Sequence, residues 1–258
     1  MIRAEKISTG YRNSTKNREK KFFVVHSGLD FSLNKGELVC LIGENGAGKS
    51  TLLKTICGFI PVVSGQLFID DIEIKNMKSR DISLKISVVQ SNAPDLDNMN
   101  AYEVVCMGRY PYTGMFGKLI DLDYQIVDDA IEIIGIEKLK SKFFNLMSDG
   151  EKQKVMIAKA LAQQTPYIVM DEPMAFLDYP SRIDMMNILK NLTKNHNKAI
   201  LLSTHNLEMA LDMADKLWVM NSKGDFIQTN SKELIENNLL EKYFNKDTAD
   251  WIALSLRS

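Results

Sequence analysis

The sequence lacks any long apolar run. Nowhere does it approach the ~18 consecutive apolar residues of a membrane-spanning helix. The first residues, Met1 to Lys6, mix charges of both signs and lack the apolar core of a signal peptide. We therefore expect a chain that is made and kept in the cytoplasm, and that takes any membrane-spanning part from another chain.

Cysteine is scarce, and neither sign of charge is in excess. The three cysteines, Cys40, Cys57 and Cys106, lie far apart without the spacing of metal ligands, which favours reduced thiols in an intracellular protein. Lys and Arg number 32 and Asp and Glu 33, so the net charge of −1 gives no electrostatic reason to expect a nucleic-acid partner. The 258 residues, 45% of them hydrophobic, suffice for a globular core.

Residues 43–51 read GENGAGKST and match the phosphate-binding pattern G-x-x-x-x-G-K-[ST] at every fixed position. Gly46 and Gly48 allow the backbone to approach a phosphate closely, and the N–H groups of the loop and of the following helix point at such an anion. Lys49 would reach the outer phosphates, and the Ser50 hydroxyl would bind Mg²⁺. A turn that binds nothing would give no packing reason for Lys-Ser-Thr, so we interpret the stretch as a phosphate loop.

Apolar runs of strand type alternate with helical periodicity along the chain, which predicts a mostly parallel sheet covered on both faces. Before the phosphate loop we expect antiparallel strands, a turn over residues 9–12, a polar basic loop over 12–21 and a hairpin turn at His26-Ser27-Gly28. Strands are expected over residues 2–8, 22–25, 29–33, 37–42, 66–69, 72–74, 86–90, 167–171, 199–203, 216–220 and 224–229. Helices are expected over residues 52–57, 101–107, 123–134, 150–164, 181–196, 206–213 and 231–244, with a short closing segment over 251–256.

Two adjacent carboxylates, Asp171 and Glu172, end the apolar strand that begins at Tyr167. Asp171 is placed to hold Mg²⁺ opposite Ser50. Glu172 points differently and can polarise an attacking water, which is the work of a general base. The alternative is that both acids merely end a strand and face solvent.

Two further polar residues, Gln90 and His205, also follow predicted strands. A lone histidine is usually structural, but ligands in open α/β sheets bind at the carboxyl ends of the strands. Because Lys49, Gln90, Asp171 and His205 all lie at or just past such ends, we expect them to form one site.

In this order the motifs resemble the nucleotide-binding subunit of an ABC (ATP-binding cassette) transporter, over nearly the whole chain. Residues 43–51 match its Walker A motif, 147–151 its signature, 167–172 its Walker B motif and 176–178 its D-loop. Gln90 matches the Q-loop glutamine, and His205 the switch histidine.

The resemblance implies ATP and Mg²⁺ as cofactors and a set of residues that bind them, Tyr11 being the aromatic that stacks on adenine. The implied ATP-binding residues are Tyr11, Gly43, Asn45, Gly46, Ala47, Gly48, Lys49, Ser50, Thr51, Ser148 and Gly150. The implied Mg²⁺ ligands are Ser50, Gln90 and Asp171, and the implied catalytic residues are Glu172, His205 and Gln90.

It further implies an α/β fold, a P-loop NTPase core of ABC type with an N-terminal antiparallel β subdomain and an inserted α-helical subdomain. The single domain of residues 1–258 would comprise a core (1–90 and 151–230), a helical subdomain with the signature (91–150) and a C-terminal helical extension (231–258). The extension would pack against the core or, alternatively, regulate it.

The signature departs from its commonest form, LSGGQ. Met147, Asp149 and Glu151 replace the usual residues, whereas Ser148 and Gly150 remain and would contact the γ-phosphate of ATP on a second copy of the chain. Asp149 is expected to point away from that phosphate. Asp is tolerated here among the family's iron-chelate importers, so the change indicates a subgroup rather than a loss of function. Met174 stands where Thr is usual, and the sequence offers no mechanistic reason for it.

Residues 107–111 and 174–178 resemble the ATPases of iron–siderophore, haem and cobalamin importers. That subgroup docks a coupling helix of its permease on this part of the helical subdomain, which implies docking near Arg109, Tyr110 and Pro111 at the cytoplasmic face of the inner membrane. The alternative is an ordinary helix-ending turn. The implied partners are the permease, a second copy of the chain and, indirectly, a substrate-binding protein outside the membrane.

Three other functions remain open from the residues. A soluble cassette acting on ribosomes or DNA usually has paired cassettes or long coiled coils, which this chain lacks. An exporter or lipoprotein-release ATPase would differ from an importer only in its permease. A non-enzymatic nucleotide sensor would be expected to lack Lys49 or Glu172, and both are present. The ATPase does not touch the cargo, so the sequence does not identify it.

Overall fold

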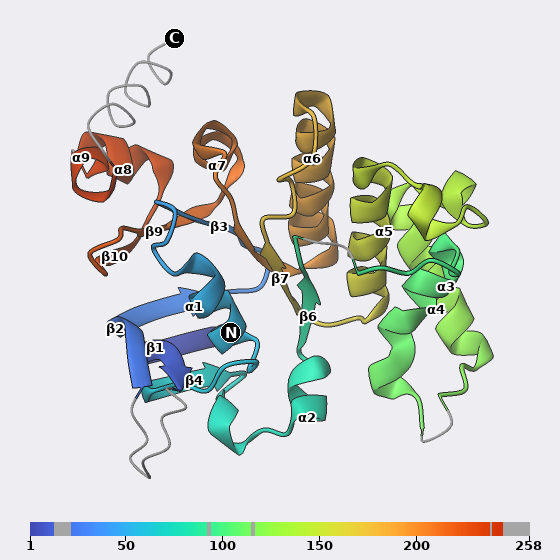
Figure 1. Ribbon diagram of the computed structural model, residues 1–258, viewed down its shortest axis with the longest axis horizontal. Helices are drawn as coiled ribbons and strands as arrows, with labels where there is room; N and C mark the ends of the chain where they lie inside the picture. Colours follow the sequence, from blue (N-terminus) through green and yellow to red (C-terminus); the bar gives the residue numbers. More distant parts are fainter. Residues whose placement is uncertain (13–21, 92–93, 115–116, 238, 245–258) are drawn as a thin grey trace.

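The computed structural model describes residues 1–12, 22–91, 94–114, 117–237 and 239–244 of the chain. A six-stranded sheet with order β10-β9-β3-β8-β7-β6 forms its centre (Figure 1). Its strands are β3 (Leu38–Gly43), β6 (Ile86–Val89), β7 (Tyr167–Asp171), β8 (Ala199–Ser203), β9 (Lys216–Met220) and β10 (Phe226–Thr229). All pairs in this sheet are parallel except β10 with β9, which confirms the predicted, mostly parallel sheet.

Strand β3 is buried on both faces, as expected for a strand inside a parallel sheet. Val39 and Leu41 belong to one apolar cluster, whereas Leu38, Cys40 and Ile42 belong to the other. This two-residue alternation divides the core into two layers, one on each side of the sheet. Burial raises the pKa of the Cys40 thiol to about 12, so this free cysteine is an inert core residue.

A second, four-stranded sheet with order β2-β1-β4-β5 is antiparallel. Its strands are β1 (Ile2–Arg12), β2 (Phe22–Leu33), β4 (Ser64–Ile69) and β5 (Ile72–Glu73). It confirms the antiparallel β structure expected around the N-terminus. Strand β1 continues through residues 9–12, so the turn predicted there is wrong.

The hairpin predicted at residues 26–28 is also wrong, because residues 22–33 form one continuous strand along β1. Between the pairs Ile7↔Leu29 and Thr9↔His26, β2 advances three residues while β1 advances two. Gly28, with φ of 68°, takes up the extra residue as a bulge, so its glycine marks an irregular strand and not a chain reversal. Residues 13–21 of the expected polar loop lie outside the described residues.

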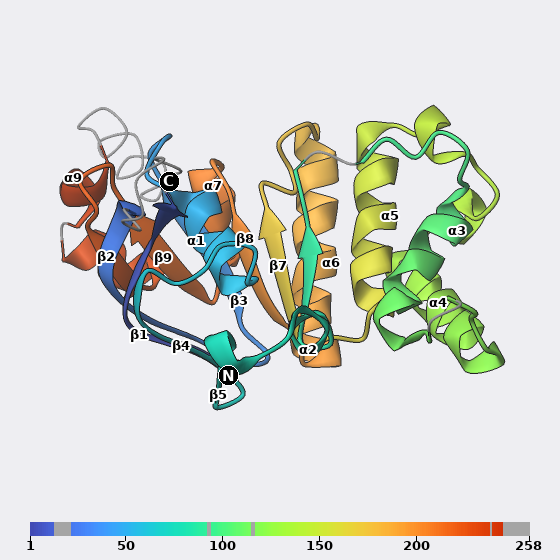
Figure 2. The same ribbon diagram turned by 60° about the horizontal axis from the view of Figure 1, so that its bottom comes forward.

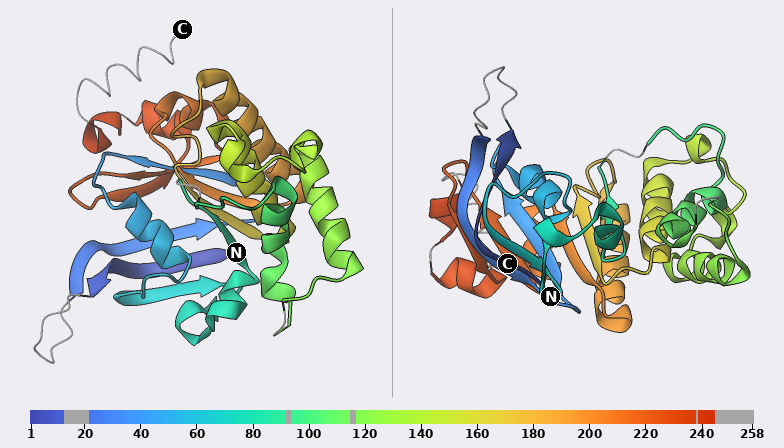
Figure 3. Two further views of the ribbon diagram at one scale, coloured as in Figure 1. Left: turned by 45° about the vertical axis from the view of Figure 1, so that its right-hand side comes forward. Right: turned by 90° about the horizontal axis from the view of Figure 1, so that it is seen from below.

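Helix α1 (Lys49–Ile56) lies between the two sheets (Figure 1 and the left view of Figure 3). Leu52 and Ile56 are fully buried in one cluster with Phe31 of β2 and Trp218 of β9. The rings of Phe31 and Trp218 have centroids 4.5 Å apart. Helix α1 is therefore buried in a cluster to which both sheets contribute.

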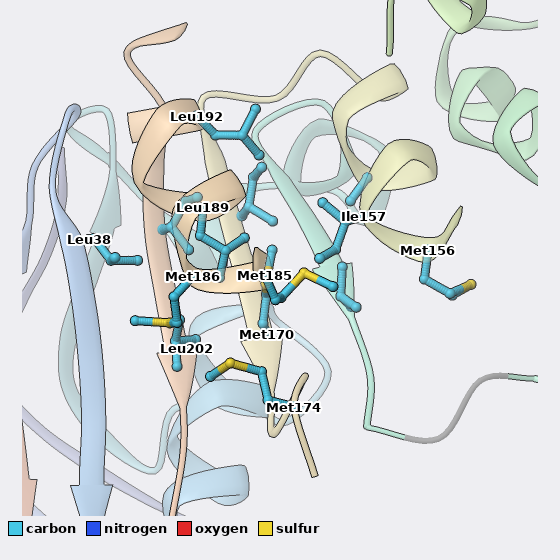
Figure 4. Packing of buried hydrophobic residues seen from close by; sticks show 14 of the residues in the cluster. Leu38, Met156, Ile157, Met170, Met174, Met185, Met186, Leu189, Leu192 and Leu202 are labelled. Atoms are coloured by element: carbon cyan, nitrogen blue, oxygen red, sulfur yellow. The ribbon is translucent and has the colours of Figure 1, made fainter. Parts of the chain in front are cut away.

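The other face of the central sheet is covered by α6 (Tyr179–His196) and α7 (Leu207–Met213). Figure 4 shows that this layer is rich in methionine, with Met185 and Met186 of α6 in one cluster with Met170 and Met174. Met174 is 4% exposed. A methionine at this position thus fills the apolar layer just beyond β7, which gives it a packing role that the sequence did not reveal.

A group of helices lies at one end of the molecule, away from the antiparallel sheet (Figure 2 and the right view of Figure 3). It comprises α3 (Ala101–Cys106), η2 (Met107–Tyr112), α4 (Asp121–Ile134), η3 (Glu137–Leu139), η4 (Phe144–Leu146) and α5 (Asp149–Ala162). These elements confirm the predicted helices within residues 101–107, 123–134 and 150–164. A short 3₁₀ turn, η1 (Ile74–Asn76), and helix α2 (Ser79–Ser83) precede β6.

The helix expected over 231–244 is two short helices, α8 (Ser231–Glu236) and α9 (Leu240–Tyr243). Asn230 caps the start of α8, and Asn237 ends it, because asparagine favours helix termini over helix interiors. Leu234 and Tyr243 are buried in the core. The closing segment expected over 251–256 lies outside the described residues. Among the residues described, no helix has both the length and the apolar character that a membrane crossing requires.

Candidate active site

The phosphate loop runs from the end of β3 to the start of α1. Gly46 and Gly48 have φ of 81° and 88°, in the left-handed region that favours glycine. A Cβ on Gly43 would lie 2.2 Å from the carbonyl oxygen of Met220, so the approach of β9 also requires glycine there. The strand–loop–helix context predicted from the sequence is confirmed.

The Lys49 side chain is buried within this loop, with 6% of the residue exposed. Its ammonium donates to the carbonyl oxygens of Gly43 at 2.7 Å and Glu44 at 3.0 Å. Burial lowers the pKa of Lys49, and the charges of Glu172 and Asp171 oppose that effect. The lysine therefore lies within the electrostatic field of both predicted carboxylates.

The Asp171 carboxylate and the Glu172 backbone are connected through Ser203, the fully buried last residue of β8. Its hydroxyl donates to Asp171 Oδ1 at 2.7 Å and accepts from the Glu172 N–H at 2.9 Å. The sequence reasoning missed this residue. A polar residue ending the apolar run 199–203 was the available signal, since β7 and β8 pair Asp171 with Ser203.

Glu172 turns away from Asp171 through an unusual backbone conformation. Its φ of 49° lies in the left-handed region, which a non-glycine residue adopts only at a cost of about 1–3 kcal/mol. Its carboxylate Oε1 lies 2.5 Å from Nε2 of His205, which follows β8. The strained position thus gives the two adjacent acids different partners.

The ends of four neighbouring strands carry the polar residues that the sequence singled out. In sheet order β3, β8, β7 and β6, the residues at or just past the carboxyl ends are Lys49, His205, Asp171 and Gln90. Gln90 is exposed at the edge strand. The structure therefore brings these residues to one edge of the sheet, with Ser50 in the first turn of α1 beside them.

Tyr11 lies at the end of β1, close to the same helix. Its hydroxyl is 3.0 Å from Oγ1 of Thr51, and 45% of the residue is exposed. The aromatic side chain thus lies beside the N-terminal end of α1 with much of its surface open.

Ser148 and Gly150 lie elsewhere. They begin α5, and Figure 2 shows β6 and β7 between α5 and α1. Within the described part of the chain, no hydrogen bond joins either residue to the phosphate loop. Ser148 caps α5 by accepting from the Glu151 N–H, and the Glu151 carboxylate accepts from the Ser148 N–H and pairs with Lys142 at 2.7 Å. Glu151 in the signature thus completes a capping box.

Arg109 does not form the exposed contact that the sequence suggested. It is 4% exposed, and its guanidinium donates to Asp123 Oδ1 at 2.9 Å and to the carbonyl oxygen of Ala162 at 2.8 Å. It therefore fixes η2 against α4 and the end of α5. Of the predicted docking residues, Tyr110 is 54% exposed and Pro111 is half-buried.

A second residue that the sequence reasoning missed is His26, which was assigned to a turn. It is 2% exposed and lies against the phosphate loop, with Nε2 2.7 Å from the carbonyl oxygen of Ala47. No sequence signal distinguishes it from a turn histidine, because the contact depends on the β-bulge that keeps β2 continuous.

Comparison with known proteins gives one family. The model of the ABC transporter family matches residues 26–175, more than half of the chain. An uncharacterised ABC transporter ATP-binding protein of Methanocaldococcus jannaschii is 34% identical over 97% of this chain and 83% of its own length. The iron(3+)-hydroxamate import ATP-binding protein FhuC of Bacillus subtilis is 30% identical over 87% of this chain and 83% of its own.

Among solved structures, one described as an inward-facing ABC transporter of metal-chelate type is similar, with a TM-score of 0.77 and 25% identity. The match covers 92% of this chain and 86% of the other. The phosphate loop, the paired acids and the histidine at one sheet edge agree with these relationships. The chain therefore belongs to the ABC transporter family, as one of its ATP-hydrolysing cassettes.

Proposed function

We propose that the chain powers the import of a ferric chelate through a membrane permease, by hydrolysing ATP at the sheet edge described above. The observation that carries the chemistry is the 2.5 Å contact of Glu172 with His205, beside Asp171 and Lys49. The cargo class rests on the similarity to the iron(3+)-hydroxamate import protein and to the metal-chelate type transporter. These relatives favour a ferric chelate over haem or cobalamin.

The phosphate loop and Tyr11 would bind ATP, Tyr11 by stacking its exposed ring on the adenine. Loop N–H groups and Lys49 would contact the phosphates, Lys49 exchanging its present carbonyl partners for phosphate oxygens.

The donor set at the sheet edge fits Mg²⁺. The Ser50 hydroxyl, the Gln90 amide oxygen and the Asp171 carboxylate are hard oxygen ligands of the kind that this ion prefers. Ser203 holds the Asp171 carboxylate through one of its oxygens. Bound Mg²⁺ would neutralise negative charge on the phosphates.

Glu172 is the proposed general base. Its carboxylate would orient a water molecule and accept its proton, while His205 fixes the carboxylate. The strained backbone of Glu172 and its N–H bond to Ser203 keep this acid apart from Asp171, so that the two carboxylates can perform different tasks.

A second copy of the chain would complete the site. Ser148 and Gly150 lie away from their own phosphate loop, at the N-terminus of a 14-residue helix that favours an anion. A Cβ on Gly150 would meet only ordinary contacts, Leu177 at 3.6 Å and Ser181 at 3.9 Å, so packing does not require this glycine. A close approach by a phosphate of the partner's ATP would require it.

The permease would dock on the helical end of the molecule, at the cytoplasmic face of the membrane. Tyr110 and Pro111 remain the proposed contacts, and Arg109 supports them from below. Beside α5 lies a groove of about 360 Å³, lined by Phe59, Gln90 and Lys159 among others. Because Gln90 lines this groove and directly follows β6, a partner in the groove would lie next to the proposed Mg²⁺ site.

The test is uptake of a radiolabelled ferric hydroxamate by cells that carry the native chain, no chain, or a Glu172→Gln chain. Uptake is expected only with the native chain, and a tagged chain purified in mild detergent should bring a polytopic permease with it. Recovery with ribosomal or DNA-repair proteins, and unchanged chelate uptake in cells without the chain, would contradict the proposal. Labelled haem and cobalamin are tested in parallel. If the chain supports uptake of one of these and not of the ferric hydroxamate, import stands and only the proposed cargo is wrong.

A further inference from the structure

His26 makes one hydrogen bond through each of its ring nitrogens while it is almost fully buried. Nε2 lies 2.7 Å from the carbonyl oxygen of Ala47, and Nδ1 lies 2.6 Å from Oγ1 of Thr9. A carbonyl oxygen only accepts, so Nε2 carries the proton and donates to Ala47. In the neutral ring Nδ1 then accepts from the Thr9 hydroxyl. The two contacts together select one tautomer.

The ring also packs against the backbone of the phosphate loop. A Cβ on Gly48 would lie 2.5 Å from two atoms of the imidazole, closer than real contacts allow. Gly48 is the residue at which the loop becomes α1. The imidazole therefore supports the loop at its junction with α1.

The hydrogen bond to Ala47 determines where a neighbouring N–H points. A peptide unit is planar and trans, so its C=O and its N–H point in opposite directions. The C=O of the Ala47–Gly48 unit is directed at His26. The Gly48 N–H of the same unit is consequently directed away from His26.

The surroundings keep the ring neutral. Burial lowers the pKa of His26, and the hydrogen bond to Ala47 opposes this only in part. A neutral ring with its proton on Nε2 is the form that the lowered pKa favours and that both hydrogen bonds accommodate.

We propose that His26 is a positioning residue for the phosphate loop. Through the chain Thr9–His26–Ala47 it holds one peptide unit so that the Gly48 N–H faces the phosphates of ATP. This inference rests on the proposed assignment of residues 43–51 as the phosphate site. Strand β1 is then linked to the nucleotide-binding region twice, indirectly through the hydrogen bond of Thr9 to His26 and directly through Tyr11 at Thr51 of α1.

Two amide variants separate positioning from packing. In His26→Gln the side-chain amide reaches the place of Nε2 and can still donate to Ala47. In His26→Asn the amide reaches only the place of Nδ1. Both variants are polar and similar in size, and Thr9→Val removes the hydroxyl at nearly constant shape.

The measurement is the dissociation constant of ATP by titration calorimetry, with the thermal unfolding midpoint of each variant. We expect His26→Asn to weaken ATP binding about fivefold to tenfold, the effect of losing one positioned hydrogen bond. His26→Gln should remain within about threefold of the native chain, and Thr9→Val should fall between the two. Equal affinities in the Gln and Asn variants would overturn the proposal, including when both are equally destabilised.

Lys49→Ala distinguishes this inference from the site assignment. If Lys49→Ala binds ATP as the native chain does, the phosphate site itself is wrongly assigned. If Lys49→Ala loses ATP binding while His26→Asn retains native affinity, the site stands and only the role of His26 is refuted.

Discussion

Glu172 combines a strained backbone with a short contact to His205, and its role can be tested by removing only its charge. Glu172→Gln keeps the shape but cannot accept a proton. We expect ATP binding to persist and hydrolysis to fall at least about a hundredfold, since general-base catalysis contributes that much or more. Because the closed state would no longer be released, a dimer should accumulate with ATP in size-exclusion chromatography. Hydrolysis near the native rate would refute the assignment of Glu172.

Ser203 is the residue that holds both acids in place. Ser203→Ala removes the hydrogen bond to Asp171 and leaves the Glu172 N–H without its acceptor. We expect kcat for ATP hydrolysis to fall about tenfold or more, with a loss of about 1–3 kcal/mol in stability. Ser87→Ala is the matched control, because Ser87 is a buried strand serine bonded to Thr165 at 3.0 Å and away from the acids. A comparable kcat in both variants would show that Ser203 is merely structural.

The buried His26 should make stability depend on pH. Its pKa is lowered in the folded chain, so the unfolded chain binds the proton more readily. The contribution is fully present above the ordinary histidine pKa of about 6.5 and is lost as the pH falls toward the lowered value. Urea unfolding at about pH 7.5 and about pH 5.5 should show a larger loss of unfolding free energy for the native chain than for His26→Gln. Equal losses in the two proteins would contradict this prediction.

At the scale of elements, the sequence predicted what depends on parallel pairing. Once strands were expected before Gln90, at Asp171 and before His205, parallel alignment alone placed their ends at one edge. The prediction from sequence failed where a single residue decides between two local geometries. In the sequence, Gly28 is compatible with a turn or with a β-bulge, and in the structure the register of β1 with β2 produces the bulge. His26 and Ser203 were missed because each acts through a partner distant in sequence.

Arg109 shows that the sequence also leaves the direction of side chains undetermined in a surface element, η2. The segment 107–111 was identified by resemblance, but the direction of its side chains depends on how η2 packs on α4 and α5. From the sequence, an exposed contact residue at Arg109 cannot be told from a buried anchor. The distinction depends on the pairing with Asp123, 14 residues later, which only the fold reveals.

The two roles within η2 can be separated by mutation. Arg109→Ala leaves the buried Asp123 carboxylate without its cation and should lower the unfolding free energy by about 3–5 kcal/mol. Tyr110→Ala should leave the unfolding midpoint almost unchanged and weaken co-purification with the permease. Thermal unfolding and detergent pull-down of both variants provide the comparison. If the Arg109→Ala protein is as stable as the native chain but no longer co-purifies with the permease, Arg109 contacts the permease directly and is not a buried anchor.

At the scale of the whole molecule, the residues of the proposed ATP site are divided between two places. The phosphate loop lies between the two sheets, whereas the start of α5 lies beyond β6 and β7 (Figure 2). Within one chain these parts do not meet among the described residues. Hydrolysis should consequently rise more than linearly with protein concentration when the chain is measured without its permease. A rate strictly proportional to concentration would indicate that one copy suffices.

The helical end of the molecule is inserted between β6 and β7, which are neighbours in the sheet. Helix α5 alone would suffice as the crossover connection from β6 to the parallel strand β7, and α3 and α4 are additional helices inserted before it. Such an insertion can change in length, surface and partner without altering the register of the strands whose ends carry the site residues. The fold thus keeps the strands that carry the site separate from the helices that are proposed to meet the permease.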